Sequence, residues 1–213
     1  MRYLYTALLM AGASTASASS PTLGGAMSHL LITVFQNQVY LSFESPSMAT
    51  VVMQDAGDGF DGAPSVLNNS GYNGQFGWLA NGFISLPTNT GIFVRTITQS
   101  PHLNVYEADT FAAILGTDGS EDVWQWDGTM THNWYSTDVH GTHFARYEVY
   151  VGDAMGNPLD TYTSGTIDLA FEYGPDLSHR IGVLGSGSVA ATPTPGVLSI
   201  GGLGLLIGGR RRR

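Results

Sequence analysis

The stretch Gly165-Thr-Ile-Asp-Leu-Ala-Phe-Glu-Tyr173 decides the fold class of this chain of 213 residues. Large apolar residues at positions 167, 169, 171 and 173 alternate with small or polar residues at positions 166, 168, 170 and 172. Because successive side chains of a β-strand point to opposite faces, this alternation predicts a strand with one face in a core and the other in water.

Eight further segments are rich in β-branched and aromatic residues and have turn residues between them. They are residues 28–35, 39–43, 49–53, 77–86, 91–98, 103–106, 110–115 and 142–151. Gln36-Asn37-Gln38 between the first two predicts a hairpin, and no long stretch shows helical periodicity. We therefore expect an all-β fold, an antiparallel β-sandwich.

Residues 1–18 have the three parts of a secretory signal peptide. Arg2 supplies the positive charge, residues 3–13 are mostly apolar, and the small residues Ala16 and Ala18 form a cleavage site. The apolar part is too short to span a membrane permanently. We expect export, with cleavage by signal peptidase close to Ser19.

The C-terminal segment joins three parts: the break Pro193-Thr194-Pro195, an apolar run at residues 196–209, and the arginines Arg210, Arg211, Arg212 and Arg213. Cationic residues after an apolar run stay on the cytoplasmic side of a membrane. This order resembles the C-terminal sorting signal of bacterial PEP-CTERM proteins, with Thr194 in the place of the family's central glutamate. The resemblance implies transient anchoring in the membrane by the tail, processing by an exosortase, and a mature protein at the cell surface or outside the cell.

The sequence thus divides into a signal peptide (residues 1–18), a β-domain (19–184), a flexible linker of small residues and proline (185–195) and a hydrophobic sorting segment (196–213). Within the β-domain, an early Ser28-His29-Leu30, an Asp/Gly-rich middle and a late His140-x-x-His143 follow in an order that is similar to a group of secreted proteins with the same kind of tail. That similarity implies a surface β-domain and no particular activity.

The charge of the chain excludes several classes of function. All eight basic residues are arginines and five of them lie in the two terminal segments, so the rest of the chain has a formal charge of 3 − 17 = −14. Such a surface disfavours nucleic acid and anionic lipid, and we expect no nucleic-acid partner. The absence of lysine excludes a P-loop and a Schiff-base enzyme, and the absence of cysteine excludes disulfides.

Histidines and a carboxylate gather just before and within the segment 142–151. Asp138, His140 and His143 lie within six residues and His132 precedes them, and these are ordinary zinc or copper ligands. In a regular strand His140 and His143 face opposite sides, so shared coordination needs a bend, which Gly141 can supply. The alternative is a polar turn that leads into a strand.

Three carboxylates, Asp55, Asp58 and Asp61, lie on a glycine-rich loop, and their oxygens suit calcium. They recur at every third position, whereas an EF-hand loop places its ligands at alternate positions. The loop fits either a calcium site or a solvated turn. A divalent cation, calcium or zinc, is therefore the cofactor that the sequence suggests.

Trp124, Trp126 and Trp134 are crowded into eleven residues, and the first two would share one face of a strand. An exposed, coplanar set would form a platform on which sugar rings stack. Buried tryptophans would instead belong to the core. The sequence leaves both alternatives open.

No catalytic motif accompanies these residues, because the chain has no Gly-x-Ser-x-Gly elbow and no thiol. We expect a binding or structural module without enzymatic activity. Two alternatives stay open: a metal-dependent hydrolase that uses the region of His132, His140 and His143, and a carbohydrate-binding module whose partner is an extracellular polysaccharide.

Overall fold

The computed structural model of the protein describes residues 19–45, 50–57 and 59–175. The signal peptide, the linker, the sorting segment and Asp58 lie outside the described residues, so their assignments stay predictions. The described part of the chain is mostly β-structure, as the sequence predicts. It contains no helix with the length and apolarity of a membrane span.

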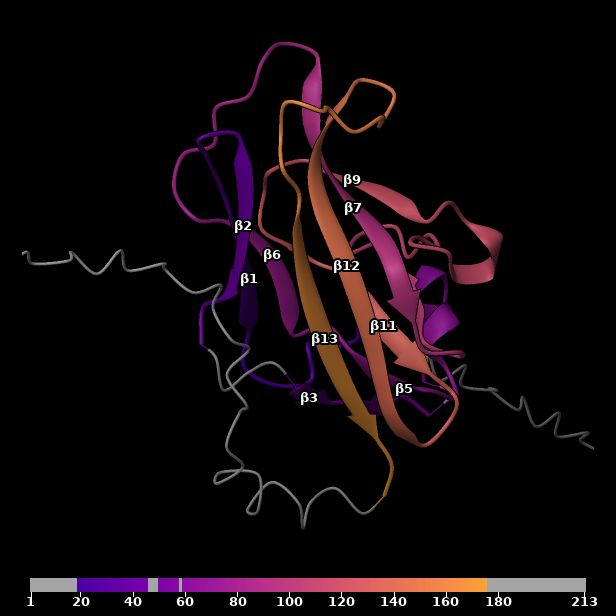
Figure 1. Cartoon of the computed structure of the whole chain (residues 1–213). Helices are drawn as coiled ribbons and strands as arrows, with labels where there is room; N and C mark the ends of the chain where they lie inside the picture. Colours follow the sequence, from indigo (N-terminus) through magenta and orange to yellow (C-terminus); the bar gives the residue numbers. More distant parts are fainter. Residues whose placement is uncertain (1–18, 46–49, 58, 176–213) are drawn as a thin grey trace, which may run out of the picture. The chain divides into compact units, whose positions relative to one another are not determined.

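Among the described residues the strands form three sheets (Figure 1). The first has the order β10 (Thr131–His132), β6 (Phe76–Ala80), β1 (Ser28–Phe35), β2 (Gln38–Phe43). The second has the order β4 (Gln54–Asp55), β5 (Gly71–Asn73), β11 (Trp134–Thr137), β8 (Asn104–Tyr106). The third has the order β3 (Thr50–Val52), β13 (Gly165–Tyr173), β12 (Gly141–Asp153), β7 (Thr90–Gln99), β9 (Val123–Trp126). Two short 3-10 helices, η2 (Ala63–Leu67) and η3 (Thr117–Gly119), lie in the connections.

β13 has the bounds and the two faces that its alternating sequence predicts. Ile167, Leu169 and Phe171 are buried, while the residues between them are more exposed. β13 pairs with β12 along its whole length, and the two long strands run side by side in Figure 1. On the buried face, the ring of Phe171 meets that of Phe76 edge-on with centroids 5.4 Å apart, which joins this strand to the first sheet.

β1 and β2 form the predicted hairpin, and Gln36 and Asn37 close it. Both residues have positive φ, 49° and 60°. Positive φ at both central positions is the geometry of a type I′ turn, whose twist matches that of the strands it connects. The predicted hairpin is confirmed.

Two pairs of strands are parallel, so the expectation of a purely antiparallel fold is wrong at these places. β1 pairs in parallel with β6, and β13 pairs in parallel with β3. In each pair several other strands intervene in the sequence. The alternation of apolar and polar residues predicts that a segment forms a strand. It does not predict which distant strand pairs with it.

Two predicted strands differ from the structure. The segment 110–115 forms no strand, because Phe111 and Leu115 each adopt a left-handed φ of 56°, which interrupts an extended chain. The predicted strand 77–86 ends at Ala80, and Gly82 follows with a φ of 91°. β5, β10 and β11 are two to four residues long, too short for a recognisable alternation.

The three sheets share one large apolar core. The largest side chains of this core that have no exposed surface come from all three sheets and are Phe76, Trp78, Tyr135, Tyr147 and Phe171. The apolar side chains of one sheet are therefore buried largely by the other two.

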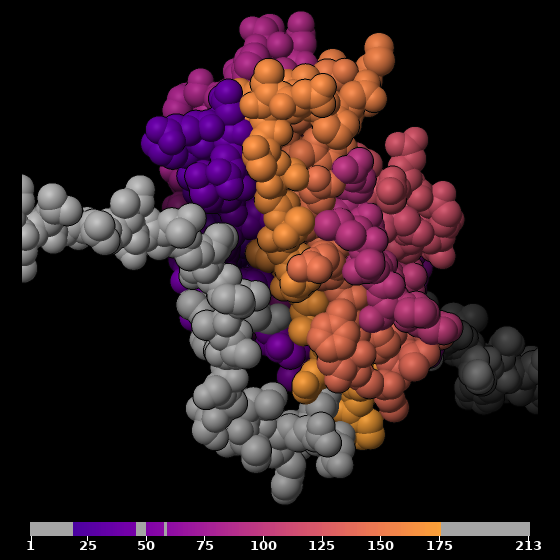
Figure 2. Space-filling view, viewed as in Figure 1, coloured from indigo at the N-terminus to yellow at the C-terminus, as the bar shows by residue number. Residues whose placement is uncertain are grey.

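The start of the described chain also lies against its end. Figure 2 shows the indigo N-terminal segment in direct contact with the orange segment that leads into β13. At this contact the Val39 N–H donates to the Thr163 carbonyl at 2.9 Å. A backbone hydrogen bond thus joins β2 of the first sheet to the segment that leads into β13.

Candidate functional site

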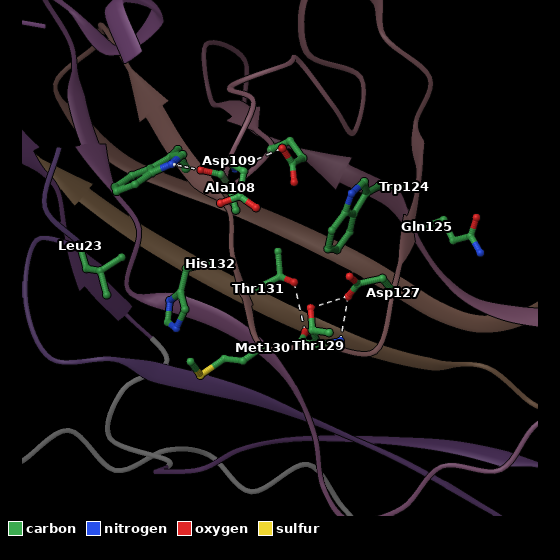
Figure 3. Close-up of a pocket in the computed structure, with 12 residues that line it drawn as sticks. Leu23, Ala108, Asp109, Trp124, Gln125, Asp127, Thr129, Met130, Thr131 and His132 are labelled. Atoms are coloured by element: carbon green, nitrogen blue, oxygen red, sulfur yellow. Dashed lines mark hydrogen bonds between the residues drawn. The ribbon is translucent and has the colours of Figure 1, made fainter. Parts of the chain in front are cut away.

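A pocket of about 420 Å³ lies where strands of all three sheets meet (Figure 3). β9, β10 and β11 contribute side chains to it, and loops complete its wall. The lining residues are Leu23, Glu107, Ala108, Asp109, Trp124, Gln125, Asp127, Thr129, Met130, Thr131, His132 and Trp134. We name it the tryptophan–carboxylate pocket.

Two of the three crowded tryptophans, Trp124 and Trp134, line this pocket. Trp134 stacks on Phe111 with ring centroids 5.7 Å apart, and its indole N–H donates to the Ala108 carbonyl at 2.9 Å. Trp124 is half-buried and packs against Trp78. Both indole rings are therefore held in place before any ligand arrives.

Trp126 belongs to the core, with only 2% of its surface exposed. Its indole N–H donates to the Thr129 carbonyl at 2.7 Å, and it borders a second pocket of about 430 Å³. Trp134 is also buried, with 7% exposed. With two of the three rings buried, the tryptophans do not form an exposed platform, and Trp124 is the one that offers indole surface to a ligand.

Two carboxylates of the pocket are ionised at neutral pH. Partial burial raises the pKa of Glu107, but hydrogen bonds from Thr110 and Asp109 outweigh it, so the pKa lies below its ordinary value. The pKa of Asp127 is also lowered, because the hydroxyl and N–H of Thr129 donate to its Oδ1 at 2.7 and 2.8 Å. In each carboxylate these bonds go to one oxygen, which leaves the other oxygen for a ligand.

His132 lies in the wall of the pocket. Its Nδ1 is 2.8 Å from the Gly74 carbonyl oxygen, which can only accept a hydrogen bond, so Nδ1 carries the ring proton. Burial lowers the pKa of this imidazole and the neighbouring His29 lowers it further, while the backbone carbonyls of Gly74 and Gln75 act in the opposite direction. The ring is therefore neutral at neutral pH, and its Nε2 carries no proton.

The histidines predicted as zinc ligands next to the pocket-lining segment have separate partners. His143 is buried, and its Nε2 lies 2.8 Å from the Val139 carbonyl oxygen. His140 is exposed, and its ring packs edge-on against Tyr173 with centroids 4.7 Å apart. Gly141 does have an unusual φ of 140°, but the bend does not give the two imidazoles a common partner.

Asp138 and His132 complete the predicted set. Asp138 Oδ1 lies 3.6 Å from Nδ1 of His102, and His132 belongs to the first sheet, whereas His143 lies on β12 of the third. Among the residues that the structure describes, no three His, Asp or Glu side chains are close enough together to hold a metal ion. The structure therefore does not gather Asp138, His140, His143 and His132 into one site.

The predicted calcium loop is described only in part. Asp55 accepts the Gly57 N–H through Oδ1 at 3.0 Å, as in a polar turn, and Asp61 is exposed. Asp58 lies outside the described residues. The calcium site of Asp55, Asp58 and Asp61 therefore stays a prediction.

The sequence predicts neither the pocket carboxylates Glu107 and Asp127 nor the contact between His132 and His29. Glu107 and Asp127 lie on loops twenty positions apart in the sequence. His29 lies near the start of the β-domain sequence, far from His132. Only the long-range pairing of strands brings such residues together, so no spacing predicts them. The crowding of tryptophans next to Asp127 is the one signal in the sequence that marks this region.

No protein-family model matches the chain, and no curated protein matches it either. A functional proposal therefore rests on the geometry of the pocket and on the sequence of the terminal segments.

Proposed function

We propose that the β-domain is a binding module that holds a neutral sugar unit of an extracellular polysaccharide in the tryptophan–carboxylate pocket. One observation carries this proposal: a partly exposed indole, that of Trp124, lines the same pocket as the ionised carboxylates of Glu107 and Asp127. The apolar face of a sugar ring packs on an aromatic ring, and carboxylates accept hydrogen bonds from its hydroxyl groups.

The charge of the pocket restricts the ligand. Its acidic residues are Glu107, Asp109 and Asp127, and the only basic side chain in its lining is the neutral imidazole of His132. A uronic acid or sulfated sugar would be repelled by these carboxylates. A neutral ligand with many hydroxyl groups fits better.

The protonation states favour binding over hydrolysis. A glycosidase needs one carboxyl group with a raised pKa, so that it can protonate the leaving oxygen. The pKa values of both Glu107 and Asp127 are lowered. We therefore propose a module without catalytic activity.

Export is the second part of the proposal. The signal peptide at residues 1–18 and the PEP-CTERM-like tail at residues 193–213 support signal peptidase and an exosortase-like protease as processing partners. The tail would hold the protein in the membrane until it is processed, and the mature protein would act at the cell surface or outside the cell. The acidic charge disfavours a nucleic-acid partner.

We also propose that the sheets pack as a β-sandwich. The core shared by all three sheets supports this arrangement, because facing sheets bury their apolar faces against each other.

Isothermal titration calorimetry of the purified protein in the presence of EDTA tests the sugar proposal. Neutral oligosaccharides should bind, and acidic ones should bind more weakly. Trp124→Ala should weaken the binding at least about tenfold, about 1.4 kcal/mol, because it removes the stacking surface.

Phe144→Ala is the matched control, since it removes an exposed aromatic ring on β12 that does not line the pocket. It should leave the affinity unchanged. If the folded protein binds no neutral oligosaccharide, or if both variants lose affinity equally, the proposal is wrong.

A further inference from the structure

Two histidines from distant parts of the sequence flank one glycine in the first sheet. His29 of β1 and His132 of β10 both pair with Gly77 of β6, one on each side. Residues paired directly across strands place their side chains on the same face of the sheet. A Cβ at Gly77 would lie 2.4 Å from His132 Nε2, so the imidazole occupies the space that the glycine leaves free. The two rings come together there, with centroids 5.7 Å apart and planes at 64°.

In both rings Nδ1 donates to an oxygen. His29 Nδ1 lies 2.6 Å from Glu44 Oε2, and His132 Nδ1 lies 2.8 Å from the Gly74 carbonyl oxygen. A carboxylate and a carbonyl only accept hydrogen bonds, so Nδ1 of each ring carries a proton. Nε2 is then the nitrogen of each ring that can give a lone pair to a metal.

Both of these Nε2 atoms are buried and lack a hydrogen-bond partner in the part of the chain that the structure describes. Buried polar atoms without a partner are rare in folded proteins, and an ion is one of the explanations for them. Two such atoms on neighbouring rings make a common partner the simplest explanation.

We propose that His29 and His132 form a two-histidine site for a divalent transition metal of the zinc or copper type. Imidazole nitrogen is a preferred ligand of these metals. A metal bound at about 2.0–2.1 Å to one nitrogen of each ring would hold the ring centroids roughly 5–6 Å apart, in agreement with the observed separation.

The hydrogen-bond acceptors of the two Nδ1 atoms are of the kind that metal-ligating histidines usually have. A ligating histidine usually donates its other N–H to a carboxylate or a backbone carbonyl, which fixes the ring and makes it more basic. Glu44 does this for His29 and Gly74 for His132. No third His, Asp or Glu joins them among the described residues, so water or an outside ligand fills the other positions.

The proposed site adjoins the tryptophan–carboxylate pocket. His132 lines that pocket, as Figure 3 shows, and its ring lies next to that of His29. The site does not depend on the proposed sugar binding, which is measured with EDTA present. It also differs from the predicted zinc set, of which it uses only His132.

The test is calorimetric titration of the untagged, metal-free protein with zinc sulfate. The wild type should bind one zinc ion per chain at this site. His29→Gln and His132→Gln should each weaken that binding at least about tenfold, and Glu44→Gln should weaken it about 10–100-fold because it acts through His29. His140→Gln, at an exposed histidine outside the site, should change nothing.

X-ray absorption of the zinc-loaded wild type provides a readout that does not depend on the folding of a variant. It should show two imidazole nitrogens at about 2.0–2.1 Å from the zinc. Absence of zinc binding, a zinc ion surrounded by oxygen alone, or loss of binding in His140→Gln instead of the other variants would overturn the proposal.

Discussion

Two fully buried tyrosines, Tyr135 and Tyr147, differ in one hydrogen bond. Burial raises the pKa of both phenols above the ordinary value. The Tyr147 hydroxyl donates to Gln99 Oε1 at 3.0 Å, whereas the Tyr135 hydroxyl has only the Trp78 indole N–H near it, without a well-formed hydrogen bond. An unpaired polar group in a core costs about 1–3 kcal/mol, so the two hydroxyl groups should have opposite effects on stability.

The phenylalanine variants measure this difference. Tyr135→Phe should leave the free energy of unfolding unchanged or raise it, because it removes a buried hydroxyl that has no well-formed hydrogen bond. Tyr147→Phe should lower it by about 1 kcal/mol, because it breaks a hydrogen bond and leaves the amide oxygen of Gln99 without its donor. Urea unfolding followed by circular dichroism gives both values, and a larger loss in Tyr135→Phe than in Tyr147→Phe would contradict this explanation.

Among the elements, the β1–β2 hairpin has a type I′ turn whose two residues are not the types that this turn prefers. Gln36 and Asn37 both have left-handed φ, and asparagine tolerates this conformation better than glutamine does. Asn-Gly is the pair that a type I′ turn prefers. The backbone carbonyl of Asn37, which accepts the Thr163 N–H at 2.8 Å, is kept by any substitution there.

Replacing the turn by Gln36→Asn together with Asn37→Gly should raise the free energy of unfolding by about 1 kcal/mol, because it relieves the left-handed strain. Gln36→Val should lower it, since a β-branched residue is poorly suited to positive φ. Thermal unfolding of the three proteins checks the order of stability. A double variant less stable than the wild type would show that the turn is held by something other than its backbone conformation.

Elements with a long alternating pattern were predictable, and elements defined by distant partners were not. β13 alternates over nine residues and was found with its bounds, and the β1–β2 hairpin followed from its turn. The segment 110–115 has strand-like residues, but left-handed φ at Phe111 and Leu115 overrides that preference. The parallel pairs of β1 with β6 and of β3 with β13 depend on long-range packing that local sequence does not record.

For the whole molecule, the export proposal makes the terminal segments decide where the protein acts. On that proposal, protein recovered from the outside of its native host should lack residues 1–18 and the block Arg210–Arg213, which signal peptidase and an exosortase-like protease would remove. Intact-protein mass spectrometry measures this directly. Replacing Pro193 and Pro195 by alanine should leave the tail attached, and an exported wild-type protein that keeps its arginine block would contradict the sorting proposal.

The candidate site could be predicted only in part, since it is a property of the whole fold. The crowded tryptophans pointed to the region of the pocket, but only Trp124 and Trp134 line it. Its carboxylates lie on loops that are distant in the sequence, and the His29–His132 pair is brought together by the pairing of β1 and β10 with β6 in the first sheet. The predicted set around His140 does not gather, because His140 packs against Tyr173, His143 bonds to the Val139 carbonyl and His132 belongs to another sheet.

The most direct test of the sugar proposal is NMR observation of the indole N–H signals of Trp78, Trp124, Trp126 and Trp134, each assigned by a Trp→Phe variant. Titration with a neutral oligosaccharide should shift the signals of Trp124 and Trp134, which line the pocket. The signal of Trp126, whose ring is buried and does not line the pocket, should move less than that of Trp124. A saturating titration that leaves the Trp124 signal unmoved would contradict the proposal that this pocket binds a sugar.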